Sequence, residues 1–135
     1  MKRRLDWPER MNDALDEARG KAFSETYCCA IFAADVVKAM TGVDPLSPEE
    51  RSAPSVASLY ALMRETHDTL LEALESLLGA QRPVALAHRG DVVLRSDEDG
   101  EALGICCGQR TAFISDEGLE FLPTRQMTAA FRVPY

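Results

Sequence analysis

The sequence predicts an α+β domain in which N-terminal helices pack on one face of an antiparallel β-sheet. Apolar residues recur at helical spacing up to about residue 78, and after Pro83 the pattern changes to short apolar runs separated by turns rich in Gly and Asp. A length of 135 residues fits one domain spanning 1–135. Hydrophobic residues at 46% and charged residues at 27% are ordinary values for a globular domain, which argues against intrinsic disorder.

Two helices are predicted before residue 45, over 7–19 and 28–40. Asp6 is the expected cap of the first helix, which carries one apolar stripe. The second helix is apolar on nearly all sides, so it should lie buried at the centre of the fold. Its Asp35 then needs a partner, such as an arginine or a helix terminus.

Three further helical segments are expected before the sheet. Residues 43–54 are rich in turn formers, and Ser47 with Glu50 forms a capping box for one helical turn. Residues 55–66 and 68–78 are amphipathic helices. The expected core face of the second consists of Leu70, Leu71, Leu74, Leu77 and Leu78.

The sheet is expected to be a meander. Turn sequences lie at 97–100, Gly108 and 116–118. The strand candidates are 91–95, 102–106, 110–114 and 119–122, with 131–133 as a further strand.

Charge and patterning exclude several classes of protein. The formal net charge of −7 disfavours nucleic acid as a partner, because an acidic surface does not neutralise phosphate. No apolar run approaches the ~20 residues needed to span a bilayer, so no membrane insertion is expected. The basic start at 1–4 is followed by Asp6 and Pro8 rather than an apolar core, so we expect cytoplasmic synthesis without a signal peptide. No motif points to a cofactor or a metal.

The four cysteines form two adjacent pairs, Cys28–Cys29 and Cys106–Cys107. The first pair opens the buried helix, where unpaired N–H groups and the helix dipole favour a thiolate, as in cysteine nucleophiles. Two other interpretations stay open. The cysteines are small buried hydrophobic residues, or four thiols converge on one zinc ion.

A cysteine nucleophile also needs a base, and the chain has two histidines. His67 lies between two amphipathic helices, where a solvated or capping role is expected. His88 lies in a loop that enters the first strand, and it is the candidate for a base at the edge of the sheet.

The order of elements resembles the NlpC-type branch of the papain-like cysteine peptidases, with a cysteine at the head of a buried helix, then Gly-Asp before an apolar strand, then a strand that brings the histidine base. The chain resembles more closely a group of small phage and prophage proteins thought to share this fold. The residues that carry this resemblance are Cys29, 32–35 (Phe-Ala-Ala-Asp), 40–45 (Met-Thr-Gly-Val-Asp-Pro), 90–93 (Gly-Asp-Val-Val) and 102–105 (Ala-Leu-Gly-Ile).

Two departures from the family pattern bear on function. The family's Asp before the nucleophile is Cys28 here, which leaves open whether Cys28 or Cys29 matches the family thiol. The position of the family histidine is Ala102. The resemblance therefore implies a catalytically degenerate pseudoenzyme with a papain-like fold, working in a phage or prophage tail with other tail proteins of the tip or hub as partners. The alternative is an active cysteine peptidase or amidase that cleaves cell-wall peptidoglycan with Cys29 as nucleophile and His88 or another group as base.

Overall fold

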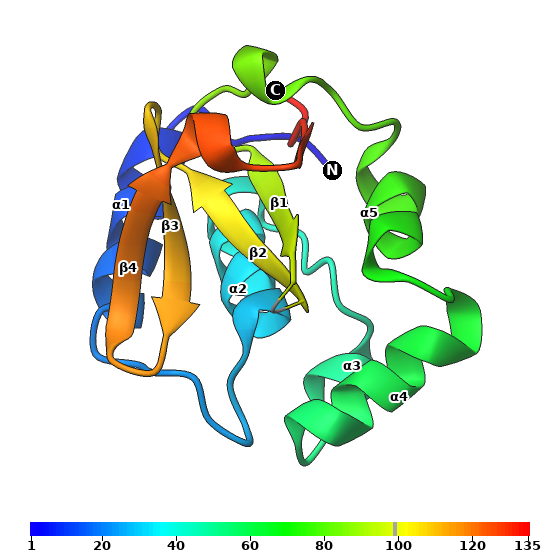
Figure 1. Cartoon of the computed structure of the whole chain (residues 1–135). Coiled ribbons are helices and arrows are strands. Elements are labelled where there is room, and N and C mark those ends of the chain that lie inside the picture. The colour runs from blue at the N-terminus through cyan, green and yellow to red at the C-terminus, as the bar shows by residue number, and fades with distance from the viewer. Residues whose placement is uncertain (99) are drawn as a thin grey trace.

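A computed structural model describes residues 1–98 and 100–135 of the chain (Figure 1). The described helices are α1 (Trp7–Ala18), α2 (Cys29–Thr41), α3 (Pro48–Arg51), α4 (Val56–Thr66) and α5 (Leu70–Leu78), with single 3-10 turns at η1 (Val84–Leu86) and η2 (Thr124–Gln126). The described strands are β1 (Val92–Asp97), β2 (Gly100–Cys106), β3 (Arg110–Ser115), β4 (Gly118–Pro123) and β5 (Ala129–Phe131). They form one antiparallel sheet in the order β4-β3-β2-β1-β5. The predicted α+β class is confirmed. The predicted turn at 97–100 includes Asp99, which lies outside the described residues.

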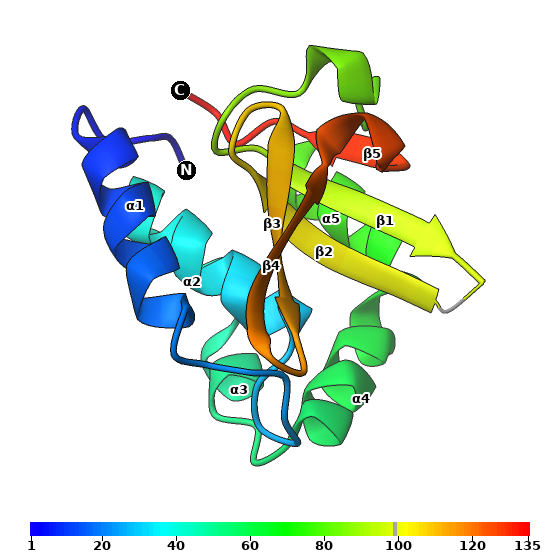
Figure 2. The same ribbon diagram turned by 60° about the vertical axis from the view of Figure 1, so that its left-hand side comes forward.

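Helix α2 is the centre of the core, as its composition predicts. Phe32 and Met40 are completely buried in it, and Gly42 ends it in a left-handed conformation that favours glycine. Helix α1 packs along α2 on the same side of the sheet (Figure 2). The expected partner of Asp35 is Arg51, whose Nη1 donates a hydrogen bond of 2.6 Å to the Asp35 carboxylate.

The two faces of the sheet belong to different clusters, because successive side chains of a strand point to opposite sides. Val92, Leu103 and Ile105 lie in the cluster that contains α2. Val93, Cys106 and Phe113 lie in a second, smaller cluster. The second cluster also receives Met127 and Ala130 from the C-terminal segment.

Helices α3, α4 and α5 lie together on the side of the molecule away from α1 (Figure 1). Few of their residues are buried. Leu59 is the one buried residue of α4, and Leu74 is the one buried residue of α5. The expected core face of α5 is therefore wrong in part, since Leu77 is 44% exposed. An amphipathic pattern indicates which side of a helix faces the protein, but it does not fix how closely that side is covered.

A buried ion cluster joins both ends of the chain to β1. Arg3, which the sequence placed in an N-terminal basic run, is completely buried, and its Nη2 donates to Asp91 Oδ1 at 2.7 Å. Arg132 Nε donates to the other oxygen of Asp91 at 3.0 Å. The Arg3 guanidinium also lies over the rings of Trp7 and Tyr135, which contact each other edge to face. The N- and C-termini consequently lie at the same end of the molecule (Figure 2).

No described helix combines the length and hydropathy that crossing a bilayer requires.

Candidate functional site

The thiol of Cys29 lies where α2, α4 and β2 meet. Cys28 is the N-cap of α2 in an extended conformation, and Cys29 is the first helical residue. The Cys29 sulfur lies 3.8 Å from the hydroxyl oxygen of Tyr60 on α4. It is also in hydrogen-bonding range of the backbone of Leu103 on β2. Cys28 is 1% exposed and belongs to the core, so Cys29 is the thiol that adjoins α4 and the sheet.

The surroundings of Cys29 oppose ionisation. Burial raises the pKa of the Cys29 thiol above its ordinary value, and the hydrogen bonds from Leu103 and Tyr60 offset this only in part. Burial and the neighbouring Cys29 likewise raise the pKa of the Tyr60 hydroxyl, so Tyr60 is a neutral hydrogen-bonding group at neutral pH. The position at a helix N-terminus therefore does not yield the thiolate that a nucleophile requires.

Ala102 holds the position of the family histidine, so the resemblance implies that it faces Cys29, and the structure contradicts this. Ala102 packs against the second cluster, on the face of the sheet away from α2, whereas Leu103 belongs to the α2 cluster. Gly104 lies on the same face as Ala102, and a Cβ there would come within 2.7 Å of the Phe113 ring. Alternation along β2 explains the error, because a shift of one residue moves a side chain to the other face. Leu103 is the β2 residue beside the thiol.

His88 does not approach Cys29 within the described part of the chain. Its backbone N–H donates to Asp91, and its ring lies 3.4 Å from the Tyr135 hydroxyl. The loop that follows it pairs with β2 at Cys106, since the Gly90 N–H donates to the Cys106 carbonyl. Cys106 lies three residues along β2 from Leu103, which is roughly 10 Å at the rise of a strand. His88 belongs to the terminal ion cluster rather than to the surroundings of the thiol.

His67 and Tyr60 flank two adjoining pockets, which the sequence did not predict. One, of about 240 Å³, lies between α2 and α5 and is mostly apolar. The other, of about 370 Å³, has a mixed lining, in which Arg64, Asp68 and Glu101 are the charged side chains and Tyr60 and His67 also take part. His67 occupies the C-cap position of α4, where its backbone N–H donates to the Met63 carbonyl, and it lines both pockets. Only one feature of the sequence points to Tyr60 as a site residue, namely that it is an aromatic residue on the inner side of the helix predicted at 55–66.

The second cysteine pair does not join the first. Cys106 is buried in the cluster on the far face of the sheet, and its sulfur contacts the carbonyl oxygen of Gly108. Burial raises the pKa of Cys107. The four thiols do not converge on one zinc ion, and across 1–98 and 100–135 no His, Cys, Asp and Glu side chains group in a way that suits a metal. The interpretation of Cys28 and Cys106 as buried hydrophobic residues is the one that fits.

Comparison with known proteins gives a family but no activity. A family model described as a domain of unknown function, DUF6950, matches residues 2–133. No curated protein matches the chain. The match includes the buried helix with Cys29, the five strands and the terminal ion cluster from Arg3 to Arg132. The chain therefore belongs to the DUF6950 family.

Proposed function

We propose that this protein is a phage or prophage tail-associated protein with a papain-like fold of the NlpC type that has lost peptidase activity. The observation that carries the loss of activity is the state of Cys29, a half-buried thiol of raised pKa beside Leu103 and Tyr60. Peptide hydrolysis by a cysteine needs an imidazole that accepts the thiol proton and later protonates the leaving amine. The aliphatic side chain of Leu103 can neither accept nor donate a proton. No histidine lies on the side of β2 that faces the thiol. The loss of peptidase activity is therefore proposed on this ground, although Ala102 itself lies on the other face.

The arrangement of α2 on the sheet supports the proposed fold. Cys29 opens the central helix and adjoins β2, which is what the resemblance to NlpC-type proteins implies for the family thiol and the strand that brings the base. Asp91, in the Gly-Asp step before β1, accepts hydrogen bonds from Arg3 and Arg132. A structural role for Asp91 agrees with retention of the fold without its chemistry.

Murein stem peptides are the substrate that tests the loss of activity. We expect no release of peptide fragments by the purified protein, and the same result for Cys29→Ala. Release by the wild type that disappears in Cys29→Ala would instead establish the alternative function, a peptidase or amidase acting on peptidoglycan. In that case, loss of the activity in His67→Ala or in His88→Ala would identify the base. Of the two histidines, His67 lines a pocket that Tyr60 also lines.

Purified tails test the proposed setting. We expect an antibody against the chain to detect it in tail particles isolated from the phage or induced prophage, and affinity capture of the tagged chain to recover tail-tip or hub proteins. Absence of the chain from purified particles, together with capture that recovers no tail protein, would overturn the tail assignment without affecting the result on activity.

A further inference from the structure

We propose that the cavity between α2 and α5 binds a free aliphatic amine, with the alkyl chain in the cavity and the ammonium group beside Asp68 and Glu101. This inference goes beyond the proposed function, because it depends neither on a tail setting nor on catalysis by Cys29. It starts from the cavity between the two helices, which has a volume of about 240 Å³.

The walls of the cavity are mostly aliphatic. Helix α2 contributes the small side chains Ala30, Ala33 and Ala34. Leu70 and Leu74 of α5 form the opposite wall. An engineered dry cavity of about 150 Å³ with similar walls holds benzene, so the larger space here suits an alkyl chain of roughly eight carbons. Removal of that chain from water supplies the affinity.

The cavity adjoins the pocket of about 370 Å³, whose lining is charged. Met63, His67, Leu70 and Ala73 line both, so the two spaces share one wall. A ligand that occupies both is therefore apolar at one end and polar at the other. This asymmetry is typical of small-molecule sites, in which a few polar groups fix the orientation of a mostly apolar ligand.

The carboxylates of the lining determine the charge expected at the polar end. Asp68 and Glu101 line the second pocket together with Arg64, and Glu50 lines the cavity. Neither Asp68 nor Glu101 has an ion-pair partner within the described part of the chain. Because carboxylates outnumber the single guanidinium, the lining favours a cation over an anion at this end.

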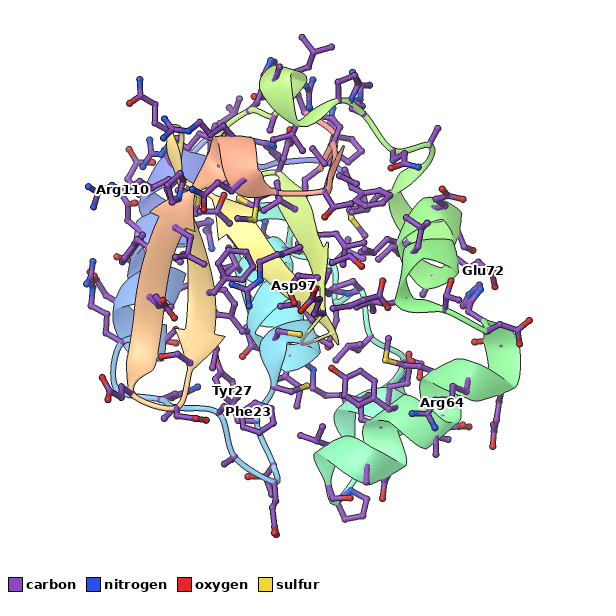
Figure 3. All side chains as sticks on the ribbon, in the orientation of Figure 1. Phe23, Tyr27, Arg64, Glu72, Asp97 and Arg110 are labelled. Atoms are coloured by element: carbon purple, nitrogen blue, oxygen red, sulfur yellow. The ribbon has the colours of Figure 1, made fainter. Side chains whose placement is uncertain are left out.

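The outer helices extend this negative charge beyond the lining. Between residues 52 and 81, Arg64 is the one Lys or Arg. The carboxylates of the same stretch are Glu65, Asp68, Glu72 and Glu75. Figure 3 shows Arg64 on α4 and Glu72 on α5. The field of these charges attracts a cationic ligand to this part of the surface and repels an anionic one.

The strands beside the cavity favour a small amine over a segment of a partner protein. Val92 of β1 and Leu103 of β2 line the cavity. Both strands have a neighbour on each side in the sheet, so neither offers the open edge to which an extended peptide adds. A volume of about 240 Å³ lies near the lower end of the range for small-molecule pockets, which fits one short ligand.

Octylamine, octanol and octanoate are the probes, because they share one alkyl length and differ in the charge of the head. A primary alkylamine is protonated at neutral pH, as lysine is. Titration calorimetry on the full chain should show the tightest binding for octylamine, with octanoate weaker by about fivefold or more. Ala73→Leu, which fills the shared wall, should weaken octylamine and octanol by about tenfold or more. Ala57→Leu is the matched control, because Ala57 is exposed on α4 and lines neither pocket, and it should bind like the wild type.

Charge variants test the position of the ammonium group. Glu101→Gln should weaken octylamine about two- to fivefold, the range of an exposed ion pair, and leave octanol unchanged. Glu75→Gln removes the same charge at an exposed position of α5 that lines neither pocket, so it should bind octylamine like the wild type. Arg64→Gln should not weaken octylamine, because it removes a cation from the lining.

Failure of the wild type to bind octylamine overturns the proposal. Octanoate that binds as tightly as octylamine, equal effects of Glu101→Gln and Glu75→Gln, or weaker octylamine binding in Arg64→Gln overturns the cationic end. Nuclear Overhauser contacts locate the ligand in the wild type itself, and they should join the alkyl protons of octylamine to the methyl groups of Ala33 and Leu74. Contacts with other methyl groups only, or wild-type affinity in Ala73→Leu that circular dichroism shows to be folded, place the ligand outside the cavity and overturn the proposal as well.

Discussion

The inner part of the molecule, made of α1, α2 and the sheet, differs from the outer part, made of α3, α4 and α5, in how completely it is packed. Helix α2 buries most of its side chains, whereas α4 and α5 each bury one residue. The cause is in the sequences. Helix α2 is apolar all round and needs cover on every side, while the outer helices offer one apolar stripe each.

The inner and outer parts therefore contribute differently to the stability of the protein and to its pockets. Close packing of the buried side chains around α2 gives the inner part its stability, and removal of even a few atoms there is costly. The outer part leaves the two pockets open, and regions with few buried apolar contacts open locally at low free energy. Cys29 lies at the boundary, because its sulfur contacts Tyr60 of the outer part. The comparison thus places the apolar pocket at the boundary between the stable scaffold and the outer helices.

The largest effect is expected from truncating an aromatic ring of the inner part. Phe32→Ala should lower the free energy of unfolding by about 3–5 kcal/mol, because Phe32 is fully buried. Leu77→Ala on α5 should lower it by less than about 1 kcal/mol, since Leu77 is largely exposed. Urea denaturation measures both. Similar losses in the two variants would contradict the division into a closely packed and a loosely packed part.

The second prediction tests whether the chain ends belong to the inner part. Asp91→Ala leaves the buried Arg3 guanidinium without its carboxylate and should cost about 3 kcal/mol or more. Asp16→Ala breaks an exposed pair with Arg19 and should cost about 0–1 kcal/mol. The same denaturation experiment compares them. An Asp91→Ala variant as stable as Asp16→Ala would mean that the ion cluster does not hold the termini.

The third prediction concerns which residue of β2 faces the thiol of Cys29, at the boundary between the inner and outer parts. In a background with Cys28, Cys106 and Cys107 replaced by Ser or Ala, Leu103→His should lower the apparent pKa of Cys29 by about one unit, or about 1.4 kcal/mol. Ala102→His should leave it unchanged, because Ala102 lies on the far face of the sheet. Alkylation rate against pH measures the pKa, with circular dichroism to verify folding. A lowered pKa in Ala102→His would reverse the assignment of the two faces.

The smallest effect is the loss of stability in alkaline solution. Burial raises the folded-state pKa of Cys29 above its unfolded value of about 8.5, so the folded state retains a proton that the unfolded state loses. This contribution is complete below about pH 8.5 and is lost as the pH rises toward the folded-state pKa. Stability should therefore fall as the pH rises above about 8.5, and fall less steeply in Cys29→Ala. Identical pH profiles for the two proteins would show that Cys29 ionises as freely in the folded chain as in the unfolded one.

Local sequence patterns predicted most elements of the fold, although the last strand is Ala129–Phe131 rather than the predicted 131–133. The change from helical spacing to short apolar runs after Pro83 predicted helices followed by a sheet, and the capping box of Ser47 and Glu50 is present in α3. Composition alone identified α2 as the central helix. These predictions succeed because helix caps, turns and amphipathic periods depend on residues only a few positions apart.

The candidate site could not be predicted in the same way, because its residues meet only through tertiary packing. Tyr60 reaches Cys29 from 31 positions along the chain, and Arg3 reaches Asp91 from 88. Motif alignment chose Ala102 as the residue opposite the thiol, but the register of β2 puts Leu103 there. The sequence by itself determined which segments become helices and strands and that a thiol opens the central helix. Only the tertiary structure decided that this thiol is held neutral, since the desolvation that raises its pKa comes from elements distant in the chain.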